Sequence, residues 1–371
     1  MDVLSRAHAL ERAGRRVVHM EIGEPDFTAP APVVEAGVRA LREGRTAYTA
    51  TLGLPALREA IAAHYAQKFS TAVDASRVVV TSGASGGLLT VSALYVDAGD
   101  EVLVPDPGYP GYRHFVRAFE GRARALAVSA AENFQPTLAM VRAAWGARTK
   151  ALVLGSPSNP TGTLIEKKEL QAIAQFIAGR GGVLIVDEIY QGLSYGVAPW
   201  TALGLPGEVV IVNSFSKYFC MTGWRLGWVV LPESAVRGFE KLAQHLFISA
   251  PSAAQHAACV AFTPESLSVL EERRREFARR RDFLLPVLKQ AGLAVSAEPH
   301  GAFYIYADCG RDARDYCLQL LEREAVAATP GIDFGANGTA RYVRFAYTRA
   351  MGDLEEAASR IKRFAASSPS A

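Results

Sequence analysis

Residues 183–190 read VLIVDEIY, an apolar run that ends in an acid. Apolar residues at consecutive positions are typical of a strand that is covered on both faces of its sheet. Segments long enough for helices separate this run from similar runs at 78–80, 101–104, 150–154 and 209–212. The alternation predicts an α/β fold with one buried, mainly parallel sheet flanked by helices.

The C-terminal part of the chain predicts a second, smaller unit. Residues 271–282 read EERRREFARRRD, which indicates a solvated helix that links two units, and only weakly an anion site. Beyond it, alternating segments at 302–307 and 341–347 flank a helical pattern at 313–324. We therefore expect a large domain at 45–276 and a small α+β domain built from both chain ends, 1–44 and 277–371.

Composition and charge exclude several classes of function. The 40 Lys and Arg residues against 37 Asp and Glu residues give a net charge of +3, which argues against nucleic acid as a partner. The longest uncharged apolar stretch, 246–262, is too short and polar to span a membrane. The four cysteines lack metal-ligand spacing, and the N-terminus lacks the apolar core of a secretory signal. We expect a cytoplasmic protein without a metal site.

Two turns after predicted strands favour an anion. TSGASGGL at 81–88 opens a helix whose amides near Ala84 and Ser85 favour a phosphate, although a Gly-rich turn with a Ser cap gives the same pattern. NSFSKYFCMTGWRLGW at 213–228 gathers hydroxyl and cationic side chains after the fifth run, at Ser214, Ser216, Lys217 and Arg225. The alternative for Lys217 is a side chain that reaches solvent from an apolar stretch.

Three further turns carry aromatic, amide and acidic side chains. PDPGYPGY at 105–112 fixes Tyr109 and Tyr112 where either ring could stack on a flat ligand or simply pack. SPSNPTG at 156–162 presents Asn159, which fits a turn or a ligand oxygen. Asp187 ends an apolar strand and needs a partner, either a ligand cation or a helix cap or ion pair. Tyr190 follows three residues later.

These turns together supply an amine, a carboxylate, a ring-stacking aromatic group, phenol and amide donors, and a phosphate cradle. Pyridoxal 5'-phosphate needs this set, because its aldehyde takes an amine, its pyridine nitrogen takes an acid partner, and its phosphate takes fixed donors. The sequence therefore predicts pyridoxal 5'-phosphate as the cofactor.

SFSK followed by MTGWRLGW, with SPSNPTG, VDEIY, PGYPGY and GEPDF upstream, resembles the aspartate aminotransferase family, the class I/II aminotransferases of fold type I. The match keeps its order from about Gly23 to Arg344. The resemblance implies a seven-stranded sheet in the large domain. It also implies transfer of an amino group between an L-amino acid and a 2-oxo acid, with ping-pong kinetics through a lysine aldimine.

The resemblance also implies roles for single residues. Lys217 would carry the cofactor and move the Cα proton, and Asp187 would pair with the pyridinium nitrogen. Tyr190 and Asn159 would bond the ring oxygen, and Tyr109 would stack on the ring. The phosphate would be held by Ala84, Ser85, Ser214, Ser216, Arg225 and Tyr48 of the neighbouring subunit, which makes the protein a homodimer with shared active sites. The α-carboxylate of the substrate would lie between Arg344 and Gly23, on an extended N-terminal arm, with Asn159 also in contact.

Some positions depart from the family's best-known members. Tyr109 stands where some have Trp, and Gly83 offers no hydroxyl where others have Ser. A second arginine for a dicarboxylic substrate has no evident position, so the preferred amino acid stays open. A lyase or synthase of the same fold remains an alternative function, and a binding or regulatory module without chemistry is disfavoured because Lys217, Asp187 and Arg344 are all present.

Overall fold

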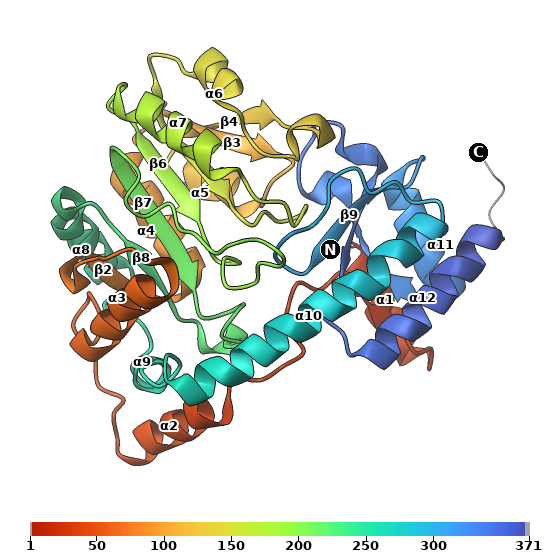
Figure 1. The fold of residues 1–371 in the computed structure, drawn as a ribbon, viewed down its shortest axis with the longest axis horizontal. Helices are drawn as coiled ribbons and strands as arrows, with labels where there is room; N and C mark the ends of the chain where they lie inside the picture. The colour runs from red at the N-terminus through yellow and green to blue at the C-terminus, as the bar shows by residue number, and fades with distance from the viewer. Residues whose placement is uncertain (1, 368–371) are drawn as a thin grey trace.

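A computed structural model describes residues 2–367, and a seven-stranded mixed sheet forms its centre (Figure 1). The neighbouring strands β7, β6, β5, β3 and β4 run parallel, and β8 runs antiparallel to both β7 and β2. In sheet order the strands are β2 (Val78–Thr81), β8 (Gly227–Val230), β7 (Glu208–Ser214), β6 (Val183–Asp187), β5 (Thr149–Gly155), β3 (Glu101–Asp106) and β4 (Arg122–Ala127). Each of the five predicted runs lies in one of these strands, so the predicted fold class is confirmed.

Alternate residues of the central strands enter two different apolar clusters. In β6, Leu184 and Val186 join one cluster, whereas Val183 and Ile185 join the other. This division explains the consecutive apolar residues, because both faces of the strand are covered. The helices that accompany this sheet along the chain are α3 (Pro55–Phe69), α4 (Gly83–Tyr95), α5 (Gly111–Ala118), α6 (Leu138–Ala144), α7 (Lys167–Ala178), α8 (Glu233–Phe247) and α9 (Ser252–Ala258).

Segments from both ends of the chain pair with each other beside this sheet. Strand β1 (Val18–His19) pairs in parallel with β10 (Val326–Ala327), and β12 (Tyr342–Ala346) lies between β9 (Tyr304–Asp308) and β11 (Thr329–Pro330). The helices here are α1 (Asp2–Arg12), α2 (Ala31–Arg42), α11 (Ala313–Glu324) and α12 (Met351–Ala366). The domain boundaries at 44/45 and 276/277 stay a prediction.

Helix α10 (Pro264–Gln290) crosses the molecule from beside α2 to beside α12 (Figure 1). Thr263 caps its first turn by accepting the N–H of Ser266. The charged segment is helical as expected, but it is not solvated throughout, because Arg280 is buried and donates to Asp26 at 2.8 Å. This ion pair attaches the N-terminal arm to α10, and the arm has no regular helix or strand at 20–30.

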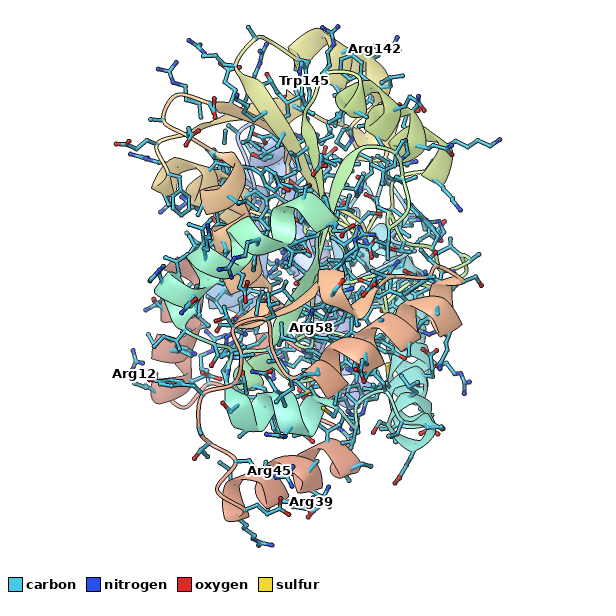
Figure 2. All side chains as sticks on the ribbon, turned by 90° about the vertical axis from the view of Figure 1, so that its left-hand side faces the viewer. Arg12, Arg39, Arg45, Arg58, Arg142 and Trp145 are labelled. Atoms are coloured by element: carbon cyan, nitrogen blue, oxygen red, sulfur yellow. The ribbon has the colours of Figure 1, made fainter. Side chains whose placement is uncertain are left out.

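None of the described helices is both long enough and apolar enough to cross a bilayer. The end of the molecule that holds α2 carries Arg39 and Arg45, whereas Arg142 and Trp145 mark the opposite end (Figure 2). Tyr48 follows Arg45 by three residues.

Candidate active site

A cavity of about 320 Å³ lies at the carboxyl ends of the parallel strands. Every predicted site residue except Tyr48 lines it. These residues are Gly23, Ala84, Ser85, Tyr109, Asn159, Asp187, Tyr190, Ser214, Ser216, Lys217, Arg225 and Arg344. The cavity is also lined by residues without a predicted role, which are Leu88, Tyr112, Pro157, Ile189, Thr222 and Tyr304.

Asp187 is a buried acid at the end of β6. Tyr112 donates its hydroxyl to one carboxylate oxygen at 2.9 Å, and the backbone N–H of Ile189 donates to the other at 3.1 Å. The described residues form no ion pair with it within 4.0 Å. Burial raises the pKa of Asp187 to about 6, although its two hydrogen bonds oppose the rise. The site therefore holds an acid that accepts hydrogen bonds only from neutral groups, while the charge of Lys217 lowers its pKa from a greater distance.

Lys217 lies in the loop after β7, and its Nζ donates to the backbone oxygen of Gly23 at 2.7 Å. Burial, together with the positive charges of Arg344 and Arg225, lowers the pKa of Lys217 to about 8, and the negative charge of Glu24 opposes this shift. An amine with this pKa is partly neutral near pH 7. It can therefore act as a nucleophile or as a base.

The residues predicted to hold a phosphate lie at the start of α4 and in the loops around β7 and β8. Among residues 2–367, no side chain caps the first turn of α4, which leaves its amides open to an anion. Ser214 donates to Leu226 and accepts the N–H of Ser216 at 3.0 Å. Arg225 adopts a left-handed conformation with φ of 53° and donates to the backbone oxygen of Thr222.

Gly83 is required by the approach of Arg225. Its φ is +72°, and a Cβ at this position would lie 2.6 Å from one guanidinium nitrogen of Arg225. The missing hydroxyl at Gly83 is therefore matched by a cation that occupies the same space. Ala84 and Ser85 follow directly in the first turn of α4.

Arg344 reaches the cavity from β12. It donates to the side-chain oxygen of Asn159 at 2.9 Å and to the backbone oxygen of Glu21 at 2.6 Å. Its buried Nε has no hydrogen-bond partner among the atoms of the described chain. A guanidinium with an unused donor beside an open cavity suits a carboxylate.

Tyr109 and Tyr190 approach the cavity from the loops that follow β3 and β6. The Tyr109 ring lies edge-on to that of Tyr112, with their centres 5.3 Å apart. The hydroxyl of Tyr190 lies 2.8 Å from that of Tyr304. Burial raises the pKa of Tyr109 and Tyr190, so both phenols stay protonated at neutral pH.

Two lining residues escaped sequence reasoning in different ways. Tyr112 belongs to the PGYPGY turn, where the sequence favours packing over a ligand contact, and its hydrogen bond to Asp187 becomes visible only in the structure. Tyr304 lies in a segment predicted only as a strand, and no signal in the sequence singles it out. Tyr48 is 78% exposed and lies outside the cavity of its own chain.

The model of the family described as aminotransferase class I and II matches residues 15–361. The chain belongs to this family. Valine–pyruvate aminotransferase of Mycobacterium tuberculosis is 38% identical to this aminotransferase over 366 residues, 97% of this chain and 94% of that protein. The (5-formylfuran-3-yl)methyl phosphate transaminase of Methanocaldococcus jannaschii is 37% identical over 98% of this chain and 95% of that protein.

A crystal structure of an aminotransferase from Mycobacterium tuberculosis has the same fold, with a TM-score of 0.94 at 38% identity. The comparison covers 99% of this chain and 96% of that chain. The predicted family, the fold type I architecture and the activity of an enzyme that transfers amino groups are thereby confirmed. The alternative of a lyase or synthase gains no support.

Proposed function

We propose that this aminotransferase uses pyridoxal 5'-phosphate, held by Lys217, to move an amino group between an L-amino acid and a 2-oxo acid. The proposal rests on one observation, which is that an amine and an acid line the same cavity. Lys217 is an amine with a lowered pKa, and Asp187 is a buried acid that forms no ion pair with the described residues. Pyridoxal 5'-phosphate fits both groups, because its aldehyde reacts with an amine and its protonated ring nitrogen pairs with an acid.

When bound, pyridoxal 5'-phosphate supplies an aldehyde that takes up the amino group and a ring that accepts the electron pair left at Cα. Asp187 keeps the ring nitrogen protonated. Tyr190 and Asn159 donate to the ring oxygen, and Tyr109 covers the ring face. The phosphate is held by Ala84, Ser85, Ser214, Ser216 and Arg225, where the open first turn of α4 supports an anion.

Arg344 binds the α-carboxylate of the amino acid and of the oxo acid. Its free Nε and the planar shape of its guanidinium support this role. Gly23 would bring the backbone of the arm against the bound carboxylate. Glycine is needed at this position because a side chain would clash with Tyr304. Once released from the cofactor, Lys217 Nζ would take the proton from Cα of the amino acid and deliver it to C4' of the cofactor. In the half-reaction with the oxo acid it would move the proton in the reverse direction.

We propose a cytoplasmic homodimer in which Tyr48 reaches the phosphate of the partner's cofactor. Tyr48 is the most exposed of the large hydrophobic side chains on the described surface, which suits a residue that acts outside its own chain. Tyr48→Phe should weaken cofactor binding about tenfold, the effect of one lost hydrogen bond to a charged group. Sedimentation of the active enzyme should give the mass of a dimer. A monomer with full turnover would contradict the shared site.

Lys217→Ala tests the cofactor assignment. The purified wild-type protein with pyridoxal 5'-phosphate should absorb visible light, and the variant should lose this band together with turnover by several orders of magnitude. Lys241→Ala, on the exposed side of α8, serves as the control and should keep both. If Lys217→Ala kept its visible band and near-normal turnover, the assignment would be wrong. A half-reaction screen with the twenty amino acids would then identify the preferred substrate.

A further inference from the structure

Tyr304 contacts three of the proposed site groups at once, although it has no role in the scheme above. Its hydroxyl lies 2.8 Å from the hydroxyl of Tyr190. The guanidinium carbon of Arg344 lies 4.3 Å from the centre of its ring, within the range of a cation–π contact. A Cβ on Gly23 would lie 2.0 Å from its hydroxyl oxygen, so the arm crosses this phenol at a glycine. Tyr304 itself is 1% exposed.

The register of the small sheet places Tyr304 in this position. In the antiparallel pair of β9 and β12, Tyr304 lies opposite Ala346, and Arg344 lies opposite Tyr306. Tyr304 and Arg344 are therefore diagonal neighbours on one face, a distance that long side chains bridge. The ring contact follows from the pairing of the strands, whereas the hydroxyl reaches across to Tyr190, which follows β6 of the large sheet.

We propose that Tyr304 is a positioning residue that sets Tyr190 through its hydroxyl and Arg344 through its ring. The inference rests on the proposed function, because Tyr190 and Arg344 matter only if they meet cofactor and substrate. A phenol that donates to a ring oxygen becomes a better donor when its own oxygen accepts a hydrogen bond. Tyr304 can supply that bond, and burial raises the pKa of its phenol, so the hydroxyl keeps its proton. One side chain thus orders a cofactor contact and a substrate contact.

Two substitutions separate the hydroxyl from the ring. Tyr304→Phe keeps the ring against Arg344 and removes the bond to Tyr190, and Tyr304→Leu removes both. Tyr306→Phe is the matched control, since Tyr306 is a buried tyrosine on the same strand, outside the cavity lining, whose hydroxyl has no partner in the described part of the chain.

The first measurement is the pH titration of the visible absorbance of the purified holoenzyme without substrate. Tyr304→Phe should move the midpoint of this titration upward by about one pH unit. A weaker hydrogen bond from Tyr190 leaves more negative charge on the ring oxygen of the cofactor, and this charge holds the proton on the nitrogen that joins Lys217 to the cofactor more tightly. The second measurement is KM. Tyr304→Phe should leave KM for amino acid and oxo acid within about twofold, whereas Tyr304→Leu should raise both about tenfold. Tyr306→Phe should change neither quantity.

A Tyr304→Phe enzyme that titrates like the wild type would overturn the hydroxyl role even if Tyr304→Leu failed to fold. An unchanged KM in folded Tyr304→Leu would overturn the ring role. Both results leave the proposed function intact, provided that the wild-type holoenzyme shows the visible band. A wild-type protein without that band would refute the proposed function, and this inference would fail with it.

Discussion

Asp187→Asn should stabilise the protein when no cofactor is bound. Asp187 is 4% exposed and forms no ion pair among residues 2–367, and the charge of Lys217 offsets its burial only in part, so its negative charge costs free energy in the folded state. Asn has nearly the same shape, and its side-chain oxygen can accept the N–H of Ile189. The substitution removes the charge and keeps the packing. A residue selected for function is expected to show such a cost.

The pKa shift of Asp187 sets the size and the pH range of the effect. Its folded-state pKa of about 6 exceeds the ordinary value of 3.8, so ionisation favours the unfolded chain. The cost is about 3 kcal/mol above pH 6, since one pKa unit corresponds to about 1.4 kcal/mol. About half of it remains at pH 5, and it disappears below about pH 4. For a chain of this length, about 3 kcal/mol corresponds to a Tm increase of roughly 4 °C.

Thermal unfolding of the cofactor-free protein at pH 8 and pH 5 tests this reasoning. Asp187→Asn should unfold about 4 °C above the wild type at pH 8, with about half that difference at pH 5. Asp74→Asn is the control, because Asp74 caps a short 3-10 turn from the surface and should change Tm little. With saturating pyridoxal 5'-phosphate the order should reverse, since the variant gains less from the cofactor. A lower Tm for cofactor-free Asp187→Asn at pH 8 would refute the argument.

Two further substitutions test the ends of the cavity. Arg344→Lys should raise KM for amino acid and oxo acid alike by about tenfold or more, because an ammonium group cannot bind both oxygens of a carboxylate. The control is Arg341→Lys, at an exposed residue just before β12, which should change neither KM. Gly83→Ser should lower the Tm of the cofactor-free protein and weaken cofactor binding. The new Cβ would lie 2.6 Å from a guanidinium nitrogen of Arg225 and push it away, and the φ of +72° is unfavourable for serine. Tighter cofactor binding by Gly83→Ser would show that the added hydroxyl outweighs the displacement.

The central strands could be predicted because burial on both faces leaves a mark in the sequence. The run at 183–186 is one example, and its residues divide between two apolar clusters. Strand β4 reads RARALA and carries exposed arginines, because an edge strand needs no continuous apolar run. Strand β8 has only four residues, and the first two belong to the MTGWRLGW motif, which sequence reasoning interprets as part of the site. Both strands were therefore missed, although the sheet that contains them was expected.

The residues of the candidate site could be singled out where one residue type satisfies a chemical need at the end of a strand. Lys217 and Asp187 stand out because an amine or acid in an apolar segment requires an explanation. Tyr112 and Tyr304 do not, since an aromatic residue in an apolar segment usually belongs to the core. What distinguishes them is the partner of the hydroxyl, Asp187 for one and Tyr190 for the other. These partners come from distant parts of the chain, and only the folded structure brings them together.

The cavity leaves several polar groups without full compensation, and they lie on separate elements. Asp187 on β6 forms no ion pair with the described residues, Arg344 on β12 has an unused buried Nε, and α4 begins without a side-chain cap. Each deficit costs the empty protein free energy, and each fits a different part of the bound molecules: a ring cation, a carboxylate and a phosphate. Cofactor and substrate together would therefore connect the large sheet with the small one. Arg344 lies on β12 of the small sheet, whereas Asp187 and the start of α4 belong to the large sheet and its helices. On the roles proposed above, cofactor alone should stabilise the large sheet, and only added substrate should stabilise the contact between the two sheets.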